Sequence, residues 1–391
     1  MTVHTGRHFL QIPGPTSVPD RVLRAIDSPV IDHRGPEFAK LGREVLAAIK
    51  TVFKTEQPVI IFPASGTGAW ESALVNVLEA GDKVLMAETG QFSTLWTRLA
   101  GRIGLDAEII SGDWRGGADP AKIEERLTAD KGHEIKAVCV VHNETSTGSL
   151  SRIKDIRDAI DRAKHPALYM VDTISSLGSA DYRHDEWGVD VTVSGSQKGL
   201  MLPPGLSFVA VSARAIKIAE TGGMPRSYWR WDEMIEQNAK GYFPYTPATN
   251  MLYGLKEAIA MLHEEGLDNV FARHARHGAA TRRAVQAWGL ENLCQNPDEF
   301  SPVLTAILMP EGRDADALRK LILENFDMSL GTGLGKVAGK VFRIGHLGHF
   351  NDLTLAGTLS GVEMGLRMFG LDNAKGGIDA ALDYLSAQAA A

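Results

Sequence analysis

Four short apolar runs between residues 58 and 212 constrain the fold of this chain most strongly. Each run is rich in β-branched residues and is separated from the next by a longer amphipathic stretch. Runs of this kind are typical of strands buried on both faces, and their alternation with helices is typical of a mainly parallel sheet. We therefore predict an α/β fold. The runs are PVIIF at 58–62, IKAVCVV at 135–141, ALYMV at 167–171 and VDVTV at 189–193.

A change of pattern after residue 251 predicts a second unit. From Met251 to Trp288 the apolar residues recur at helical spacing, and the strand patterns LTAILM and KVFRIG follow. A chain of 391 residues with 44% hydrophobic content is long enough for two packed units. We expect an N-terminal arm over residues 1–20, a large domain over 21–260 and a small α/β domain over 261–391.

Charge and hydropathy argue against nucleic-acid and membrane partners. Lys plus Arg number 41 against 48 for Asp plus Glu, and no basic block stands out. No apolar run is long enough to cross a bilayer, and the N-terminal residues lack the apolar core of a signal peptide, so we expect a cytoplasmic protein. The two cysteines, Cys139 and Cys294, are interpreted as buried small hydrophobes rather than disulfide or zinc ligands.

The residues that follow the predicted strands suggest a ligand site, because open α/β sheets bind ligands beyond the carboxyl ends of their strands. Ser65, Gly66 and Thr67 form a small-residue turn that opens a helix, and exposed backbone N–H groups there suit a phosphate. This turn is not a nucleotide P-loop, because no Gly-Lys-Ser/Thr follows. The similar stretch GTGLGK at 331–336 is interpreted as a loop. Asp172 follows the third run and either caps the next helix or faces a cationic ligand.

Lys198 follows the fourth run in the cramped setting SGSQKG. Most lysines lie at the surface, and burying this charge is costly. A partly desolvated lysine beside cations has a lowered pKa, and its neutral amine forms a Schiff base with an aldehyde. Pyridoxal phosphate supplies the aldehyde, the phosphate and a cationic pyridinium together. The phosphate turn, Asp172 and Lys198 together predict this cofactor.

The order and spacing of the motifs over nearly the whole chain resemble the fold type I pyridoxal-phosphate enzymes of the class V aminotransferases. Among these, the chain resembles serine–glyoxylate and alanine–glyoxylate aminotransferases. The resemblance implies a large domain with a mainly parallel sheet flanked by helices and a smaller C-terminal α/β domain. The matching stretches are PGPTSVP, HRGPEF, FPASGTGAWESALVNVL, HNETSTG, VDTISS, GSQKGL, YTPATNMLYGL, ARHARHGAATRRAVQAWGL and GKVAGKVFRIGHLG.

The same resemblance implies a role for each site residue. It makes Lys198 the Schiff-base lysine and Asp172 the partner that keeps the pyridine nitrogen protonated. It makes Arg343 the receptor of the substrate α-carboxylate, for which a guanidinium fork is well suited. The further cofactor contacts that it implies are Ser65, Gly66, Thr67 and Gln197 at the phosphate, Thr145 near the phenolic oxygen, and Phe92 as the stacked ring, with Trp96 as the other aromatic in that stretch.

Two segments resemble parts that family dimers exchange between subunits. YFPYTPATN is similar to the segment that reaches the neighbour's phosphate, through Thr246 and either Tyr245 or Tyr242. DHRGPEF is similar to the segment near the neighbour's substrate, and it contains His33 where plant serine–glyoxylate enzymes carry tyrosine. The resemblance therefore implies a homodimer, and it leaves open whether dimers pair further.

The activity that the resemblance implies is transfer of an amino group from an L-amino acid to glyoxylate, which yields glycine and a 2-oxo acid. The overall resemblance ranks L-serine first as donor, L-aspartate a near second and alanine third. His33 would hydrogen-bond the serine hydroxyl, whereas a protonated His33 or Arg34 would pair with the β-carboxylate of aspartate. A cysteine desulfurase is a weaker reading, since neither cysteine is placed as a mobile nucleophile. A regulatory protein without catalysis would be expected to lack Lys198, Asp172 or Arg343. All three are present, so the sequence does not support that reading.

His346 and His349 are spaced like a pair of metal ligands. They lack a third ligand nearby, so no metal is expected.

Overall fold

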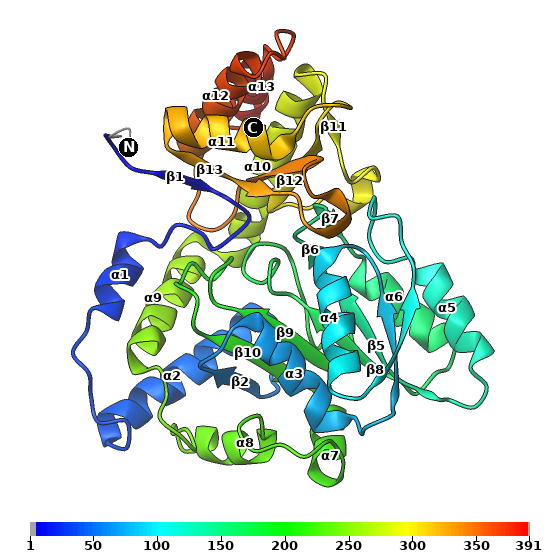
Figure 1. The fold of residues 1–391 in the computed structure, drawn as a ribbon. Coiled ribbons are helices and arrows are strands. Elements are labelled where there is room, and N and C mark those ends of the chain that lie inside the picture. Colours follow the sequence, from blue (N-terminus) through cyan, green and yellow to red (C-terminus); the bar gives the residue numbers. More distant parts are fainter. Residues whose placement is uncertain (1–4, 390–391) are drawn as a thin grey trace.

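The computed structural model describes residues 5–389, and these form two α/β units that are each built on a separate sheet (Figure 1). The larger sheet has the strand order β2-β10-β9-β8-β5-β3-β4. Its strands pair in parallel from β4 through β9, whereas β10 is antiparallel to both of its neighbours. The strands are β2 (Val59–Phe62), β3 (Lys83–Ala87), β4 (Asp106–Ile110), β5 (Ile135–Val141), β8 (Leu168–Asp172), β9 (Val191–Gly195) and β10 (Ser207–Val211).

The four apolar runs are all strands of this sheet, so the prediction of a mainly parallel α/β fold is confirmed. All but one of the residues in these four strands are buried. Three further strands, β3, β4 and β10, were not singled out from the sequence. The edge strand β4 has no buried residue, which explains why its sequence carries no strong apolar signal.

Helices cover both faces of the larger sheet. In β8, Tyr169 and Val171 pack into one apolar cluster, whereas Leu168 and Met170 pack into the other. The first cluster is covered by α1 (Asp20–Ile26), α2 (Pro36–Phe53), α5 (Pro120–Ala129), α6 (Ile153–Arg162) and α9 (Thr249–Glu265). The second is covered by α3 (Gly66–Val77), α4 (Gln91–Arg102), α7 (Ala213–Thr221) and α8 (Trp231–Ala239).

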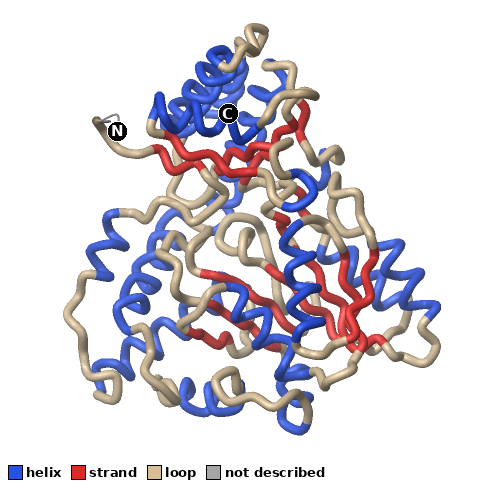
Figure 2. The backbone as a smooth tube through the Cα atoms, viewed as in Figure 1, coloured by secondary structure: helices blue, strands red, loops and turns tan. Residues whose placement is uncertain are grey.

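The smaller sheet includes a strand from the N-terminal arm. Its order is β1-β13-β14-β12-β11, and Figure 2 shows its strands as a group separate from those of the larger sheet. Strand β1 pairs in parallel with β13, with Phe9 opposite Met328. The strands are β1 (Phe9–Gln11), β11 (Glu291–Asn292), β12 (Leu304–Leu308), β13 (Met328–Thr332) and β14 (Val341–Gly345). The helices are α10 (Leu267–Ala287), α11 (Ala315–Phe326), α12 (Asp352–Met368) and α13 (Gly377–Ala389).

Two local differences from the sequence interpretation concern glycine-rich segments. The helical region from Met251 to Trp288 is confirmed, but it is divided into α9 and α10 at Gly266, whose φ of 85° interrupts the helix. The expected loop at 331–336 is partly wrong: its first residues end β13, and a 3₁₀ turn, η2 (Gly335–Val337), follows. Pairing with β14 orders the end of β13, which the sequence alone does not reveal.

None of the helices in residues 5–389 has the length and apolar character needed to span a membrane. A short ribbon of β6 (Asn143–Glu144) and β7 (Ser149–Leu150) follows β5 at the carboxyl edge of the larger sheet. Ser301 of the small unit donates a backbone hydrogen bond to Gly148 in the turn of this ribbon. The carboxyl edge of the larger sheet therefore contacts the smaller unit.

Candidate active site

Lys198 and Asp172 lie at the carboxyl ends of two neighbouring strands. Asp172 is the last residue of β8, Lys198 follows β9, and the register of these parallel strands places Asp172 opposite Val193. Both side chains are buried, with relative exposures of 3% for Asp172 and 7% for Lys198. The structure therefore brings together the acid and the lysine that the sequence predicted at separate strand ends.

Burial moves the pKa values of these two groups toward each other. Burial lowers the pKa of Lys198 to about 7, with a further lowering from the positive charge of Arg343 and an opposing effect of Asp172. Burial raises the pKa of Asp172 to about 7, against hydrogen bonds from the Ile174 N–H and from Trp70. A substantial fraction of Lys198 is therefore the neutral amine at neutral pH, which is the nucleophilic form.

The N-terminal arm covers Lys198. The Lys198 ammonium donates a hydrogen bond to the carbonyl oxygen of Pro13. Thr16 donates from its backbone to the Gln197 carbonyl and from its hydroxyl to the Lys198 carbonyl, at 3.1 and 3.2 Å. A Cβ on Gly14 would lie 2.4 Å from Lys198 Cδ, so only glycine fits beside the lysine stem. The arm was predicted as a region, but its contact with Lys198 was not.

The predicted phosphate turn is the N-terminus of α3. Ser65 is the N-cap residue, but its side chain makes no capping hydrogen bond, and both Ser65 and Thr67 are exposed. Gln197 has a buried Oε1 without a hydrogen-bond partner in the described part of the chain. A helix N-terminus with open N–H donors fits a phosphate group, whereas the Gln197 Oε1 is itself an acceptor, so this residue would reach a phosphate only through its Nε2 donor. These residues are therefore suited to hold the phosphate of the expected cofactor.

Arg343 and Thr145 connect the two units. Arg343 lies on β14 with a relative exposure of 6%, and its Nη1 donates to the Thr145 carbonyl oxygen at 2.7 Å. Its Nε donates to the Thr332 carbonyl at 2.8 Å. Burial lowers the pKa of the Arg343 guanidinium to about 10, so it remains charged at neutral pH. The Thr145 hydroxyl is hydrogen-bonded to the Ser175 hydroxyl.

Glu144 anchors the start of the helix that carries Phe92. Its buried carboxylate accepts hydrogen bonds from the backbone N–H groups of Phe92 and Ser93, at 3.2 and 3.1 Å. Burial raises the pKa of Glu144, and these N–H donors oppose that shift. Sequence reasoning gave Glu144 no role, although it directly precedes Thr145 in HNETSTG. Phe92 packs at the edge of the apolar cluster that contains Trp96, whose ring is buried.

Trp70 is a second contact of Asp172 that sequence reasoning missed. The indole Nε1–H of Trp70 donates to Asp172 Oδ2 at 2.8 Å, while the Ile174 N–H donates to Oδ1 at 2.7 Å. Trp70 belongs to the stretch SGTGAWES, where an apolar helix position is ordinarily interpreted as core. Its polar contact depends on the packing of α3 against β9 and β10, which a one-dimensional pattern does not encode.

The residues predicted to act across a dimer do not join this cluster. Within residues 5–389, none of His33, Tyr245 and Thr246 forms a hydrogen bond with Lys198, Asp172 or Arg343. His33 lines a cavity of about 560 Å³, and its Nε2 is buried without a partner in the described structure. Thr246 is exposed, and Tyr245 stacks on Tyr228 with ring centroids 4.5 Å apart. The other residues that line the cavity are Arg34, Glu233, Glu236, Gln237, Tyr242, Phe243 and Pro244.

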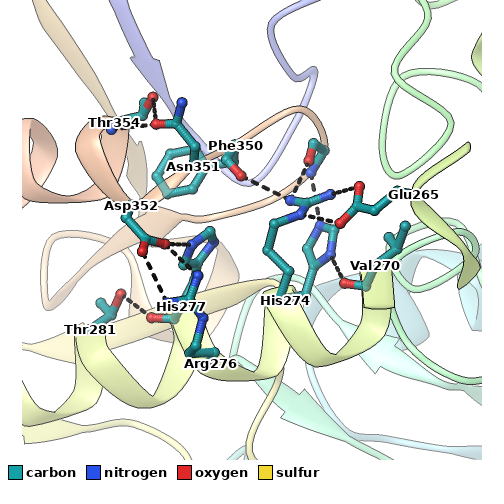
Figure 3. Close-up of polar contacts among 12 residues, drawn as sticks. Glu265, Val270, His274, Arg276, His277, Thr281, Phe350, Asn351, Asp352 and Thr354 are labelled. Carbon is teal, nitrogen blue, oxygen red and sulfur yellow. Dashed lines mark hydrogen bonds and ion pairs between the residues drawn. The ribbon is translucent and has the colours of Figure 1, made fainter. Parts of the chain in front are cut away.

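Helix α10 holds the loop that follows the Arg343 strand, as Figure 3 shows. His274 Nδ1 lies 2.7 Å from the Val270 carbonyl, and its Nε2 accepts from the Gly348 N–H at 3.1 Å. Arg273 Nη1 donates to the Gly348 and Phe350 carbonyls, at 3.1 and 2.9 Å. His346 is the first residue of this loop, and its Nε2 lies 3.1 Å from the Thr305 hydroxyl oxygen. The pair His346 and His349 therefore belongs to a hydrogen-bonded loop next to the Arg343 strand.

Both cysteines are buried, as expected. Cys139 lies inside β5, and burial raises the pKa of its thiol. Burial likewise raises the pKa of the Cys294 thiol, to about 11. A reactive cysteine has a lowered pKa and is exposed to solvent, and neither thiol has these properties. The arrangement therefore does not favour the chemistry of a desulfurase.

Comparisons with known proteins agree with this geometry. The family model described as "Aminotransferase class-V" matches residues 8–346. The chain is 51% identical to a serine–glyoxylate aminotransferase of Methylorubrum extorquens, over 98% of this chain and 97% of the relative. It is 46% identical to an L-aspartate–glyoxylate aminotransferase of Paracoccus denitrificans, over 94% and 93%. The crystal structure of pyridoxamine-pyruvate aminotransferase from Mesorhizobium loti matches with a TM-score of 0.90 at 26% identity, over 99% of each chain.

Proposed function

This chain belongs to the class V aminotransferases, enzymes that use pyridoxal phosphate, and we propose that it transfers the amino group of L-serine to glyoxylate, with hydroxypyruvate and glycine as products. The observation that carries the proposal is the convergence of buried Lys198 and Asp172, at one edge of the larger sheet, with buried Arg343 of the smaller sheet. Relatives named serine–glyoxylate aminotransferase, at 51% and 49% identity over nearly the whole chain, support serine as the donor.

Pyridoxal phosphate, when bound, supplies an electron sink for the pair left on the substrate Cα after proton loss. The neutral amine of Lys198 removes that proton, because its lowered pKa leaves a fraction unprotonated at neutral pH. The Asp172 carboxylate would hold a proton on the pyridine nitrogen of the bound cofactor. The backbone N–H groups at the start of α3, and the Nε2 donor of Gln197, would hold the phosphate.

Arg343 binds the substrate α-carboxylate. Two of its guanidinium nitrogens are occupied by backbone carbonyls, which leaves Nη2 without a hydrogen bond in the described residues. The fixed orientation of the side chain allows this nitrogen to donate to a carboxylate without first being ordered. The N-terminal arm covers the Lys198 stem and excludes water from that side.

We further propose that the enzyme is a homodimer in which Thr246, with Tyr245 or Tyr242, and His33 complete the neighbour's site. The exposure of Thr246 supports this proposal, as does the cavity beside His33, since both are available to a second chain. The unsatisfied Nε2 of His33 is a polar group for which a substrate or a partner residue would supply a hydrogen bond.

L-aspartate is the second candidate donor. A relative named L-aspartate–glyoxylate aminotransferase, at 46% identity, favours it, and so does Arg34, which lines the same cavity as His33 and would pair with a β-carboxylate. Steady-state kcat/KM for serine, aspartate and alanine at saturating glyoxylate tests the choice. We expect serine to lead. If aspartate leads by about tenfold, roughly 1.4 kcal/mol of transition-state preference, the donor assignment is wrong. If no donor forms glycine from glyoxylate, the acceptor assignment is wrong.

A further inference from the structure

Trp70 forms the only side-chain hydrogen bond that Asp172 receives within residues 5–389. The donor is the indole Nε1–H, the acceptor is Asp172 Oδ2, and the distance is 2.8 Å. Both residues are buried, with relative exposures of 2% and 3%. An ionised carboxylate offers about two acceptor positions on each oxygen, so the donors Trp70 and Ile174 hold both oxygens in place and leave each with a position for one more N–H.

The charged groups around Asp172 explain why this bond matters. Burial favours the neutral acid, and the negative charge of Glu144 acts in the same direction. The opposing influences are the Ile174 N–H, the Trp70 N–H and the charge of Lys198. The charge on Lys198 is itself reduced, since burial and Arg343 lower the pKa of that lysine to about 7. The Trp70 hydrogen bond is therefore one of the few interactions that lower the pKa of Asp172 and do not depend on the protonation of Lys198.

The neighbouring indole has no comparable contact. Trp96 stacks on Trp70 with ring centroids 5.9 Å apart and an interplanar angle of 13°. Its Nε1 is buried and has no partner in the described part of the chain. Packing alone would place two aromatic rings here, but it would not direct one N–H at Asp172. The difference between the two indoles indicates that the Trp70 N–H serves Asp172.

Helix α3 carries both Trp70 and the phosphate turn. The helix begins at Gly66, and Trp70 lies one turn later, where its indole reaches Asp172 at the end of β8. One rigid element therefore fixes the group that receives the phosphate and the donor that orients Asp172. A shift of α3 would move both ends of a bound cofactor's site together.

We propose that Trp70 is a positioning residue that keeps Asp172 ionised and oriented toward the pyridine nitrogen of the cofactor. The proposal rests on the assignment of pyridoxal phosphate to this site but not on the identity of the donor or of glyoxylate. Trp70 itself does not touch the reacting atoms. It acts through the charge and the geometry of the Asp172 carboxylate.

The matched variants Trp70→Phe and Trp96→Phe test this proposal. Each removes an indole N–H from the same stacked pair, but only the first removes a hydrogen bond to Asp172. Affinity for pyridoxal phosphate is measured by fluorescence titration of the cofactor-free protein between pH 5 and pH 9. Loss of a hydrogen bond to a carboxylate is expected to raise the pKa of its acid by about one unit. In Trp70→Phe we therefore expect the acid-side loss of affinity to begin about one pH unit higher than in the wild type, with affinity roughly tenfold weaker near pH 6.5. Trp96→Phe should differ from the wild type by less than about twofold.

A double-mutant cycle separates the positioning role from packing. In an Asp172→Asn background, Trp70→Phe should change cofactor affinity and its pH profile by less than about twofold, because there is no carboxylate charge left to stabilise. If Trp70→Phe folds poorly, the isosteric β-(3-benzothienyl)alanine at position 70 replaces the N–H with sulfur and keeps the shape. Equal effects of the Trp70 and Trp96 variants, or an unchanged pH profile in the isostere, would overturn the proposal. Both readouts are independent of any amino donor, so they remain decisive if the donor assignment is wrong.

Discussion

Arg343 and Thr145 are 198 positions apart in the chain, yet Nη1 of the arginine donates to the backbone carbonyl of the threonine at 2.7 Å. Arg343 lies on the smaller sheet, and Thr145 follows the larger one. This bond fixes the predicted substrate arginine relative to the predicted cofactor site. Because the backbone carbonyl is neutral, it does not neutralise the guanidinium, and the positive charge of Arg343 remains available for a carboxylate.

Replacement of Arg343 with lysine tests this arrangement. Lysine keeps a positive charge but lacks the fork that bonds Thr332, Thr145 and a carboxylate at the same time. We expect the KM values for the amino donor and for glyoxylate to rise by roughly 10- to 100-fold, equivalent to about 1.4–2.7 kcal/mol. Arg319→Lys is the control, because Arg319 is bonded to Asp316 and to the Leu330 carbonyl. Similar KM values in the two variants would contradict carboxylate binding by Arg343.

Replacement of Asp172 with asparagine should leave the cofactor bound and slow the proton-transfer step. A neutral amide does not stabilise a protonated pyridine nitrogen, so the electron sink is weaker. We expect kcat to fall by roughly 100-fold or more, with a smaller change in KM. Stopped-flow absorbance with saturating donor measures the step directly. An unchanged single-turnover rate would rule out the role proposed for Asp172.

Lys198 is expected to cost stability in the cofactor-free protein. Its native pKa is about 7 and its ordinary value is 10.5, so the native state releases the proton first as the pH rises. The burial penalty is complete below about pH 7, declines between pH 7 and 10.5, and is absent above that range. Lys198→Met should therefore stabilise the cofactor-free protein by on the order of 1–3 kcal/mol at pH 6.5 and by progressively less toward pH 10.

Denaturant unfolding of both cofactor-free proteins at several pH values checks this expectation. The sign of the trend is the decisive feature. A stability difference that grows with pH would mean that the native pKa of Lys198 is not lowered. The same variant should show no transamination and no covalently bound cofactor, because the amine has been removed.

Arg273 is expected to act on catalysis through the loop after β14. Arg273→Lys removes the paired donors to Gly348 and Phe350, and this loop adjoins the strand of Arg343. We expect kcat/KM to fall by roughly 3- to 10-fold, with about 1–2 kcal/mol of lost stability. Arg276→Lys, one turn away, breaks a bidentate contact with Asp352 (Figure 3), as Arg273→Lys also does with Glu265, and it should lose stability without a matching loss of kcat/KM. Equal catalytic losses in both would show that only folding stability is affected.

Hybrid dimers test whether Thr246 acts on the neighbouring site. Lys198→Ala and Thr246→Ala subunits are mixed, and activity is measured at limiting pyridoxal phosphate. If Thr246 serves the neighbour, one site of the hybrid contains both an intact Lys198 and an intact Thr246, and activity exceeds that of either parent. If Thr246 serves its own subunit, every site has a defect, and mixing restores nothing.

Much of the larger sheet could be predicted because its central strands are buried on both faces. VIIF, AVCVV, LYMV and VTV carry continuous apolar signals, and the polar residues just after them mark the strand ends. The amino-acid pattern alone therefore assigns Asp172 and Lys198 to one edge of a sheet. The edge strand β4 and the N-terminal strand β1 carry few buried residues, so their sequences gave no comparable signal.

The sequence by itself determined the α/β class, the strand ends that present Lys198 and Asp172, and the family to which the chain belongs. The class and the strand ends depend on local periodicity, and the family depends on the order and spacing of motifs along the chain. All of these can be read from the one-dimensional sequence. Only the tertiary structure decided that Trp70 donates to Asp172, that Pro13 accepts from Lys198 and that Arg343 bonds Thr145. Each of these contacts joins residues far apart in sequence, and its direction depends on how helices and sheets pack in three dimensions. A hydrogen bond requires both distance and angle to be satisfied, and no one-dimensional pattern specifies either.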